Sequence, residues 1–244
     1  MTAKTKKPEI APKKAPGPTT LSIDIGGSGL KAMLLDAKGK APSERQRIPT
    51  PAVATPAAVL KKLDKLAELL PGFDRVSVGF PGVVRHGVTY TAVNLHSRWM
   101  KFNFAEELAK RWGKPVRMAN DADIAGYAAV QGEGVELVLT LGTGMGSALF
   151  TDGRLCPGLE LSLHPWNKKT YEDYLGNQGL SHMGKARWNQ VLLKVIRLTR
   201  DVFSWDHLYL GGGNTRKITV KLPKDVSIVS NDMGLLGGAA LWKI

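Results

Sequence analysis

The feature that most constrains the fold is a pattern of apolar strand, glycine-rich turn and apolar strand, which occurs twice. The first copy joins Leu21–Ile25 to Leu30–Leu35 through GGSG, and the second joins Leu137–Leu141 to Ser147–Phe150 through GTGMG. A plain β-hairpin can use the same residues, so one copy alone does not show whether the turn binds phosphate or is only a tight turn. Because the pattern occurs near the start of each half, we predict two halves that are built alike.

Strands and helices alternate along both halves. Thr55 followed by Pro56 is an N-cap signal, and leucines at helical spacing continue until Pro71. Asn103 with Glu106 resembles a capping box that begins a second helix. Further helices are predicted at about 184–203 and at 233–242, and further strands at 43–48, 75–80, 114–120, 207–210 and 226–230. The alternation predicts an α/β fold.

Composition excludes several classes of protein. The chain has 244 residues and a single cysteine, Cys156, which excludes an intramolecular disulfide framework and a zinc site of several thiolates. The five histidines show no H-x-x-x-H or H-x-x-H pair, so a structural metal site is not expected. No apolar run approaches the roughly 18 residues of a membrane span, and we therefore expect a cytoplasmic protein without a membrane partner.

The charge balance favours anionic partners. The formal net charge is +13, which attracts phosphorylated metabolites, polyphosphate or nucleic acid. Part of the charge lies in residues 1–18, where five lysines are mixed with prolines. This composition predicts a disordered basic tail.

The two glycine turns are candidate phosphate-binding sites. Backbone N–H groups can converge on a phosphate at glycines, because no Cβ holds the anion away. Asp24 precedes the first turn and could hold Mg²⁺ through water, since hard cations take carboxylate oxygens. Neither turn fits G-x-x-x-x-G-K-[ST] or G-x-G-x-x-G. A P-loop and a Rossmann dinucleotide site are therefore disfavoured.

Asn120 and Asp121 stand where a predicted strand gives way to a helical segment. An aspartate at such a junction is commonly a helix cap. It could also be a general base that takes a proton from an attacking hydroxyl, with Asn120 bound to neighbouring hydroxyls. Taken alone, the pair favours the helix cap, whereas the other motifs of the chain favour the general base.

These motifs, in their order along the chain, resemble those of the ASKHA superfamily, whose actin-like fold is shared by sugar kinases and chaperone ATPases. The motifs are DIGGSGLK, GFPGVV, AVNL followed by Trp99, NDAD, LGTGMGSALFTDG and LGGGN. The closer resemblance is to the ROK family of sugar kinases, and within it to the bacterial polyphosphate glucokinase group, from about Leu21 onward. It implies a two-domain actin-like, ribonuclease H-like fold. Each domain would be a mixed sheet flanked by helices, with a sugar in the cleft between the domains.

The resemblance also implies domain boundaries and assembly. After the tail of residues 1–18, a small N-terminal domain is expected at 19–118 and a larger C-terminal domain at 119–244, whose last helix could pack back on the first. Many relatives carry a C-x-C-G-x-x-G-C zinc loop, which this chain lacks, so no structural zinc is expected. A homodimer is the expected assembly.

The activity implied is transfer of a phosphoryl group from polyphosphate or ATP to the 6-hydroxyl of a hexose, with glucose expected. Asp121 would be the catalytic base, Asp24 would hold Mg²⁺, and Lys31 is interpreted as a solvated strand charge. The donor would be bound by Asp24, Gly26, Gly27, Ser28, Gly29, Gly142, Thr143, Gly144, Gly146, Gly212 and Gly213. The sugar would be bound by Asn94, Asn120, Asp121, Glu160, His164 and Glu172.

The sugar site departs from the family pattern. The E-x-G-H motif of the family corresponds here to Glu160, Leu161, Ser162 and Leu163, so a leucine stands where the histidine is expected. An unpaired sugar hydroxyl costs roughly 1–3 kcal/mol. Three explanations remain open: His164 substitutes, the sugar is not glucose, or sugar binding is weak.

Two other functions compete with a kinase. A catalytically weakened sugar or phosphate sensor would explain Leu163. A nucleic-acid-binding regulator would explain the net charge, but residues 1–18 are too short and proline-rich for a helix-turn-helix, so no nucleic-acid partner is expected.

Overall fold

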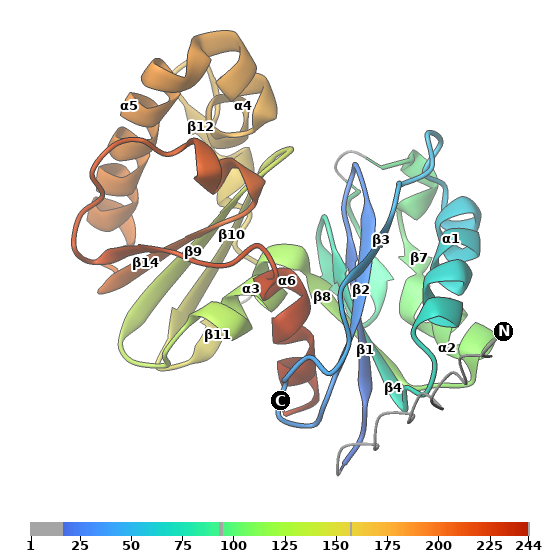
Figure 1. The fold of residues 1–244 in the computed structure, drawn as a ribbon. Helices are drawn as coiled ribbons and strands as arrows, with labels where there is room; N and C mark the ends of the chain where they lie inside the picture. The colour runs from blue at the N-terminus through green and yellow to red at the C-terminus, as the bar shows by residue number, and fades with distance from the viewer. Residues whose placement is uncertain (1–16, 93–94, 157, 244) are drawn as a thin grey trace, which may run out of the picture.

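The computed structural model describes residues 17–92, 95–156 and 158–243, which form two mixed β-sheets with helices between and outside them (Figure 1). Each sheet contains one copy of the strand, glycine turn and strand pattern, so the predicted α/β fold with two similar halves is confirmed. Nearly all of the predicted tail, and Asn94, lie outside the described residues. No helix within these ranges is long and apolar enough to cross a membrane.

The first sheet has the strand order β3-β2-β1-β4-β8. Its strands are β1 (Thr20–Ile25), β2 (Leu30–Leu35), β3 (Gln46–Ile48), β4 (Arg75–Phe80) and β8 (Val116–Asn120). The first three are antiparallel neighbours, whereas β4 lies parallel to β1 and β8 lies parallel to β4. Leu21, Ile23 and Ile25 of β1 are fully buried in the core of this half.

Helices α1 (Pro56–Leu69) and α2 (Phe104–Trp112) cover the face of this sheet that points away from the second sheet (Figure 1). The Thr55 side chain accepts a hydrogen bond from the backbone N–H of Ala58, and Asn103 accepts one from that of Glu106. Both predicted N-caps are therefore confirmed. The buried residues of α1 recur every three or four positions, so the helix presents one apolar stripe to the strands.

A small ribbon lies between β4 and α2. Its strands are β5 (Val84–Arg85), β6 (Val88–Thr89) and β7 (Phe102–Asn103), and the 3₁₀ helix η1 (Ser97–Trp99) precedes β7. Trp99 is fully buried, donates Nε1–H to the carbonyl of Ala54 at 2.7 Å and packs against Phe80 and Phe104. These contacts anchor the loop after β4 to the first core.

The second sheet has the strand order β11-β10-β9-β14-β15. Its strands are β9 (Val135–Leu141), β10 (Met145–Thr151), β11 (Arg154–Cys156), β14 (His207–Gly211) and β15 (Val226–Ile228). Between β10 and β11, Asp152 and Gly153 have φ values of 49° and 73°, as a two-residue hairpin turn requires. An Asp-Gly pair is a typical sequence signal for such a turn.

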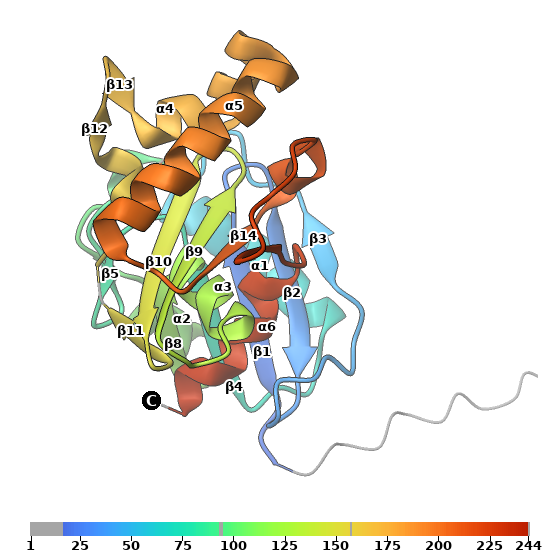
Figure 2. The same ribbon diagram turned by 90° about the vertical axis from the view of Figure 1, so that its left-hand side faces the viewer.

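Helices α4 (Tyr171–Leu175) and α5 (Asn177–Phe203) pack on this sheet, and α5 runs diagonally across it (Figure 2). Gly184, whose φ of 74° is not helical, divides α5 into two helices, and the part that follows it matches the helix predicted at about 184–203. The remaining short elements are β12 (Pro165–Trp166), β13 (Lys169–Thr170) and the 3₁₀ helices η2 (Leu161–Leu163) and η3 (Gly213–Lys217).

Helix α3 (Asp121–Ala129) and the C-terminal segment, which comprises α6 (Met233–Leu236) and the 3₁₀ helix η4 (Gly237–Trp242), lie between the two sheets (Figure 1). The prediction of one helix at 233–242 is therefore wrong after Leu236, where the α-helix changes to a 3₁₀ helix. A Cβ at Gly237 would overlap the carbonyl of Ile124, and one at Gly238 would overlap the Ser22 side chain. The two glycines let the C-terminal segment approach α3 and β1 this closely.

The C-terminal segment is bonded to the first sheet. Ser22 Oγ donates to the carbonyl of Leu235 at 2.7 Å, and Ser77 Oγ donates to that of Gly238 at 2.6 Å. The Trp242 ring lies 4.9 Å from the guanidinium of Arg75 and donates Nε1–H to Ser77 Oγ at 2.8 Å. These contacts join the end of the chain to its first strands.

Candidate active site

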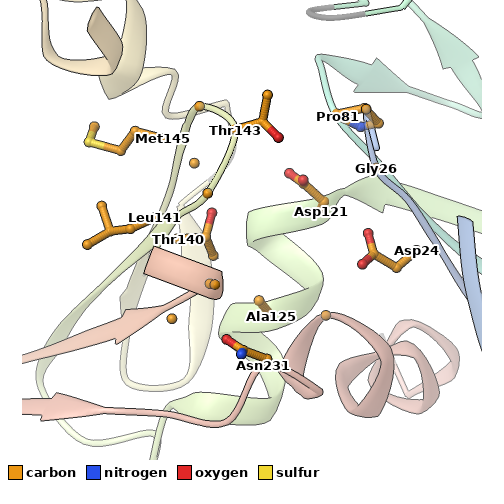
Figure 3. Close-up of a pocket in the computed structure, with 18 of the residues that line it drawn as sticks. Asp24, Gly26, Pro81, Asp121, Ala125, Thr140, Leu141, Thr143, Met145 and Asn231 are labelled. Atoms are coloured by element: carbon orange, nitrogen blue, oxygen red, sulfur yellow. The ribbon is translucent and has the colours of Figure 1, made fainter. Parts of the chain in front are cut away.

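A pocket of about 400 Å³ lies between the two sheets and is lined by both glycine turns. Figure 3 shows Asp121 at the start of α3, between Thr143 of the second turn and Asp24 and Gly26 of the first. The predicted residues that line it are Asp24, Gly26, Gly27, Ser28, Gly29, Asn120, Asp121, Gly142, Thr143, Gly144, Gly146, Glu160, Glu172, Gly212 and Gly213. The structure thus brings together residues from opposite ends of the chain.

The first glycine turn is closed by backbone and side-chain bonds. The N–H of Gly26 donates to the carbonyl of Gly29 at 3.0 Å, as in a tight hairpin. Thr50 Oγ1 donates to the carbonyl of Gly26 at 2.6 Å, which joins the turn to the chain after β3. The turn is therefore a hairpin and also part of the pocket wall.

Asp24 is paired with Lys31, for which a solvated strand charge is the sequence-based expectation. Lys31 Nζ lies 2.6 Å from Asp24 Oδ2, and both residues line the pocket. The two residues face each other because the hairpin register places Asp24 opposite Lys31. The interpretation of Lys31 is corrected: it is an ion-pair partner inside the pocket.

The chemistry of Asp24 fits Mg²⁺ held mainly by other ligands. No group of three or more His, Cys, Asp or Glu side chains within the described ranges could hold a metal ion by itself. A single carboxylate beside a glycine turn fits Mg²⁺, which usually keeps several waters and takes further oxygens from substrate phosphates.

The second glycine turn is fixed by two asparagines that the sequence analysis did not assign to the site. Asn214 Nδ2 donates to the carbonyl of Gly142 at 3.0 Å and to Asn177 Oδ1 at 2.9 Å. The backbone N–H of Asn177 also reaches the carbonyls of Gly142 and Thr143. The turn is thereby joined to the start of α5 and to η3. Asn214 lies inside the LGGGN motif, whereas nothing in the sequence marks Asn177.

The helix cap at the end of β8 is Asn120, not Asp121. Asn120 Oδ1 accepts the N–H of Ala122 at 2.8 Å, and its Nδ2 donates to the carbonyl of Gly82 at 3.2 Å. Asp121 follows as the first residue of α3 and accepts from the same N–H through Oδ1 at 2.8 Å. The cap is therefore supplied by the neighbour, and the Asp121 carboxyl faces the pocket (Figure 3).

Burial raises the pKa of Asp121 to about 7, and the negative charges of Asp24, Asp123 and Glu160 add to the effect. Burial likewise raises the pKa of Asp123 to about 7, with the charge of Glu160 contributing. A carboxyl group with a pKa near neutrality suits proton transfer, because both of its protonation states are accessible. Asp123 was not among the predicted site residues, although it lies in the same NDAD motif.

Two glutamates complete an acidic side of the pocket. Burial raises the pKa of Glu160, and the nearby charge of Glu172 acts in the same direction. Burial also raises the pKa of Glu172, which accepts a hydrogen bond from the backbone of Met145. A Cβ at Gly144 would lie 2.6 Å from a carboxylate oxygen of Glu172. Glu172 therefore lies against the second glycine turn.

His164, predicted as a sugar ligand, does not line the pocket in the structure. It follows η2, and its ring lies 5.9 Å from that of Tyr171, in a small apolar cavity behind the pocket wall. The turn of η2 directs Ser162 inward, where it is buried and lines the pocket, whereas Leu163 is 49% exposed. The imidazole is thus displaced because it comes one residue late in a tight turn.

Comparison with known proteins gives consistent matches. The sequence profile of the ROK family matches residues 20–162. Polyphosphate glucokinase of Mycobacterium tuberculosis (strain ATCC 25618 / H37Rv) is 31% identical over 251 residues, which is 93% of each chain. N-acetylmannosamine kinase of Escherichia coli (strain SE11) is 35% identical over 147 residues, or 57% of this chain and 50% of that protein.

Solved structures show the same fold. The inorganic polyphosphate/ATP-glucomannokinase from Arthrobacter sp. strain KM superposes with a TM-score of 0.83 and 32% identity, covering 92% of this chain and 98% of that one. A ROK family glucokinase from Streptomyces griseus, solved with glucose and AMPPNP, has a TM-score of 0.73 at 18% identity, with 91% and 98% covered. The expected two-domain actin-like fold is confirmed.

Proposed function

The chain belongs to the ROK family, and from this premise we propose that it is a glucokinase-type sugar kinase that transfers a phosphoryl group from polyphosphate or ATP to the 6-hydroxyl of glucose. The observation that carries the proposal is the position of Asp121. Its carboxyl group lies between the two glycine turns, and its pKa of about 7 suits a general base.

The two glycine turns and Asp24 would bind the phosphoryl donor. Gly26, Gly27, Ser28 and Gly29 would cradle the transferring phosphate, and the second turn would hold the donor from the opposite side. Mg²⁺, held at Asp24 through water and by the donor's oxygens, would neutralise the phosphate charge. Domain closure would exclude water from the phosphates.

Proton transfer completes the chemistry. The sugar oxygen attacks phosphorus and forms the new O–P bond as the bond to the donor oxygen breaks. The hydroxyl proton passes to the carboxylate of Asp121, which later releases it to water. The products are sugar 6-phosphate and either ADP or a shortened polyphosphate. Since little covalent work falls to the protein, positioning and charge neutralisation dominate the rate.

The acceptor site uses Glu160, which directly precedes η2, and Ser162 within it. Both line the pocket, and the exposed fraction of Ser162 is only 5%. Its hydroxyl would take over part of the hydrogen bonding that the family histidine supplies. Glu172 is proposed as a donor-side residue as well as a sugar ligand, because it lies against Gly144. Asn94 lies outside the described residues and stays a sequence-based prediction.

The competing functions have less support. A sensor would not need a carboxyl group poised between two phosphate cradles, and relatives over nearly the whole chain are named as kinases. A ROK family transcriptional regulator superposes with a TM-score of 0.72 at 17% identity, which shows the fold alone. A cytoplasmic location and a homodimer remain predictions.

A coupled assay tests the proposal. Purified protein is incubated with glucose, mannose or N-acetylmannosamine, each with ATP or polyphosphate and Mg²⁺, and hexose 6-phosphate is measured. We expect turnover with glucose and at least one donor, and loss of it in Asp121→Asn. Absence of product with every pair, or full activity of Asp121→Asn, would disprove the proposal.

A further inference from the structure

Three charged side chains form a row across the first sheet. The strand register places Asp24 of β1 opposite Lys31 of β2, and Lys31 opposite Arg47 of β3. Side chains of directly paired residues point to the same face of a sheet. All three line the pocket. The row is therefore built into the wall of the cleft next to the first glycine turn.

The row carries one positive charge that no carboxylate within the described ranges balances. Lys31 is paired with Asp24 at 2.6 Å, whereas no described carboxylate lies within ion-pair distance of Arg47. Two like charges directly opposite each other on neighbouring strands are destabilising. An anion bound between Lys31 and Arg47 would remove this cost.

The Arg47 guanidinium lies directly on the glycine turn. Its terminal nitrogen donates to the carbonyl of Ser28 at 3.1 Å. A Cβ at Gly29 would lie 2.6 Å from Arg47 Nε and 2.9 Å from Cζ, so the absence of a side chain at residue 29 makes room for it. The guanidinium fork is thus held beside the N–H groups that would cradle a phosphate, and its geometry matches phosphate oxygens.

The direction of the row indicates which phosphates it can reach. β3 is an edge strand, so the row runs from the strand of Asp24 to the rim of the sheet. Two strand spacings correspond to about 10 Å. Gly212 and Gly213, which are also predicted to bind the donor, directly follow β14 of the second sheet and line the pocket from that side. A nucleoside bound at Gly212 and Gly213 would therefore lie away from Arg47.

We propose that Lys31 and Arg47 form a distal phosphate subsite, over which a linear polyphosphate chain leaves the cleft across the edge strand β3. The inference rests on the proposed kinase function and specifies how one donor class is bound. Arg47 binds phosphates beyond the one that is transferred. It contributes more to the binding of polyphosphate than of ATP, because only polyphosphate has further phosphates that extend as far as Arg47.

The test separates binding from catalysis. Binding of a medium-length polyphosphate to the full chain without sugar is measured by calorimetry for wild type, Arg47→Met, Arg47→Lys and Arg45→Met. Arg45 is the matched control, because it is paired with Asp232 and does not line the pocket. KM and kcat for polyphosphate and for ATP are measured in parallel, and thermal unfolding verifies that each variant is folded.

Arg47→Met should weaken polyphosphate binding about tenfold, the usual order for one charge-assisted hydrogen-bonded pair, and flatten its salt dependence. KM for polyphosphate should rise about as much, with kcat at saturation and KM for glucose within twofold. KM for ATP should rise less than threefold, Arg47→Lys should keep most of the affinity, and Arg45→Met should match wild type.

An equal effect of Arg47→Met and Arg45→Met, or a larger loss for ATP than for polyphosphate, would overturn the subsite. So would wild-type protein that fails to bind polyphosphate. If no sugar is phosphorylated but polyphosphate binds and Arg47→Met weakens it selectively, the subsite stands and the proposed kinase function fails.

Discussion

Replacing Asp121 with asparagine should slow phosphoryl transfer and, at the same time, stabilise the folded protein at neutral pH. Asparagine has nearly the same shape and cannot ionise, so the variant removes the proton acceptor and the buried charge together. Loss of a general base typically costs 10²–10⁴-fold in rate, and we expect kcat to fall within that range.

The stability change follows from the displaced pKa. The pKa of Asp121 is raised from 3.8 to about 7, so between about pH 4 and pH 7 the folded protein binds more protons than the unfolded chain. Stability therefore falls as pH rises through this window and is constant above it. The difference in pKa corresponds to about 4 kcal/mol, and solvent in the cleft reduces this, so we expect Asp121→Asn to gain about 2 kcal/mol at pH 8.

Urea unfolding at pH 8, pH 6 and pH 4 measures this, together with kcat at pH 8. The stabilisation should be largest at pH 8 and vanish near pH 4, where the carboxyl group is protonated in both states. Asp201→Asn, which removes an exposed carboxylate on α5, is the control and should change neither quantity. A destabilised Asp121→Asn at pH 8, or a gain that does not depend on pH, would refute the reasoning from burial.

Three further predictions concern other parts of the molecule. Gly238→Ala should lower the free energy of unfolding by about 2 kcal/mol, because the new Cβ would overlap the Ser22 side chain. Urea denaturation measures this against the control Gly213→Ala, whose new Cβ would have no other atom within 4 Å. Glu160→Gln should raise KM for the sugar at least tenfold and leave KM for the donor within twofold, and steady-state kinetics with equal changes in both would contradict the assignment. Thr50→Val removes the 2.6 Å bond to the carbonyl of Gly26 and should raise KM for the donor several-fold, whereas an unchanged KM would show that the turn does not need this bond.

Much of the fold could be predicted from local signals. Thr55 and Asn103 cap helices as predicted, and both glycine turns join the predicted strands, because caps and hairpins depend on neighbouring residues. The last helix was less predictable. Its 3₁₀ section depends on how closely Gly237 and Gly238 approach Ile124 and Ser22, which is a tertiary contact without a local signal.

The candidate site shows the same division. Asp24 and Asp121 could be found from motifs, since each stands at a strand end beside glycines or a helix start. The roles of Lys31 and Arg47 could not, because they depend on the register between strands. His164 lies outside the pocket because it follows η2, where an offset of one residue turns a side chain by roughly 120°.

The position of the C-terminal segment has a consequence for how the protein is made. Met33 and Leu35 of β2 are covered by Leu235 and Ala239, which follow every strand of both sheets along the chain. During translation the first sheet therefore leaves the ribosome with this apolar patch uncovered until residues 235–239 have also emerged. Premature termination shortly before Leu235 would thus expose the N-terminal half to aggregation or proteolysis, although every strand of its own sheet is present.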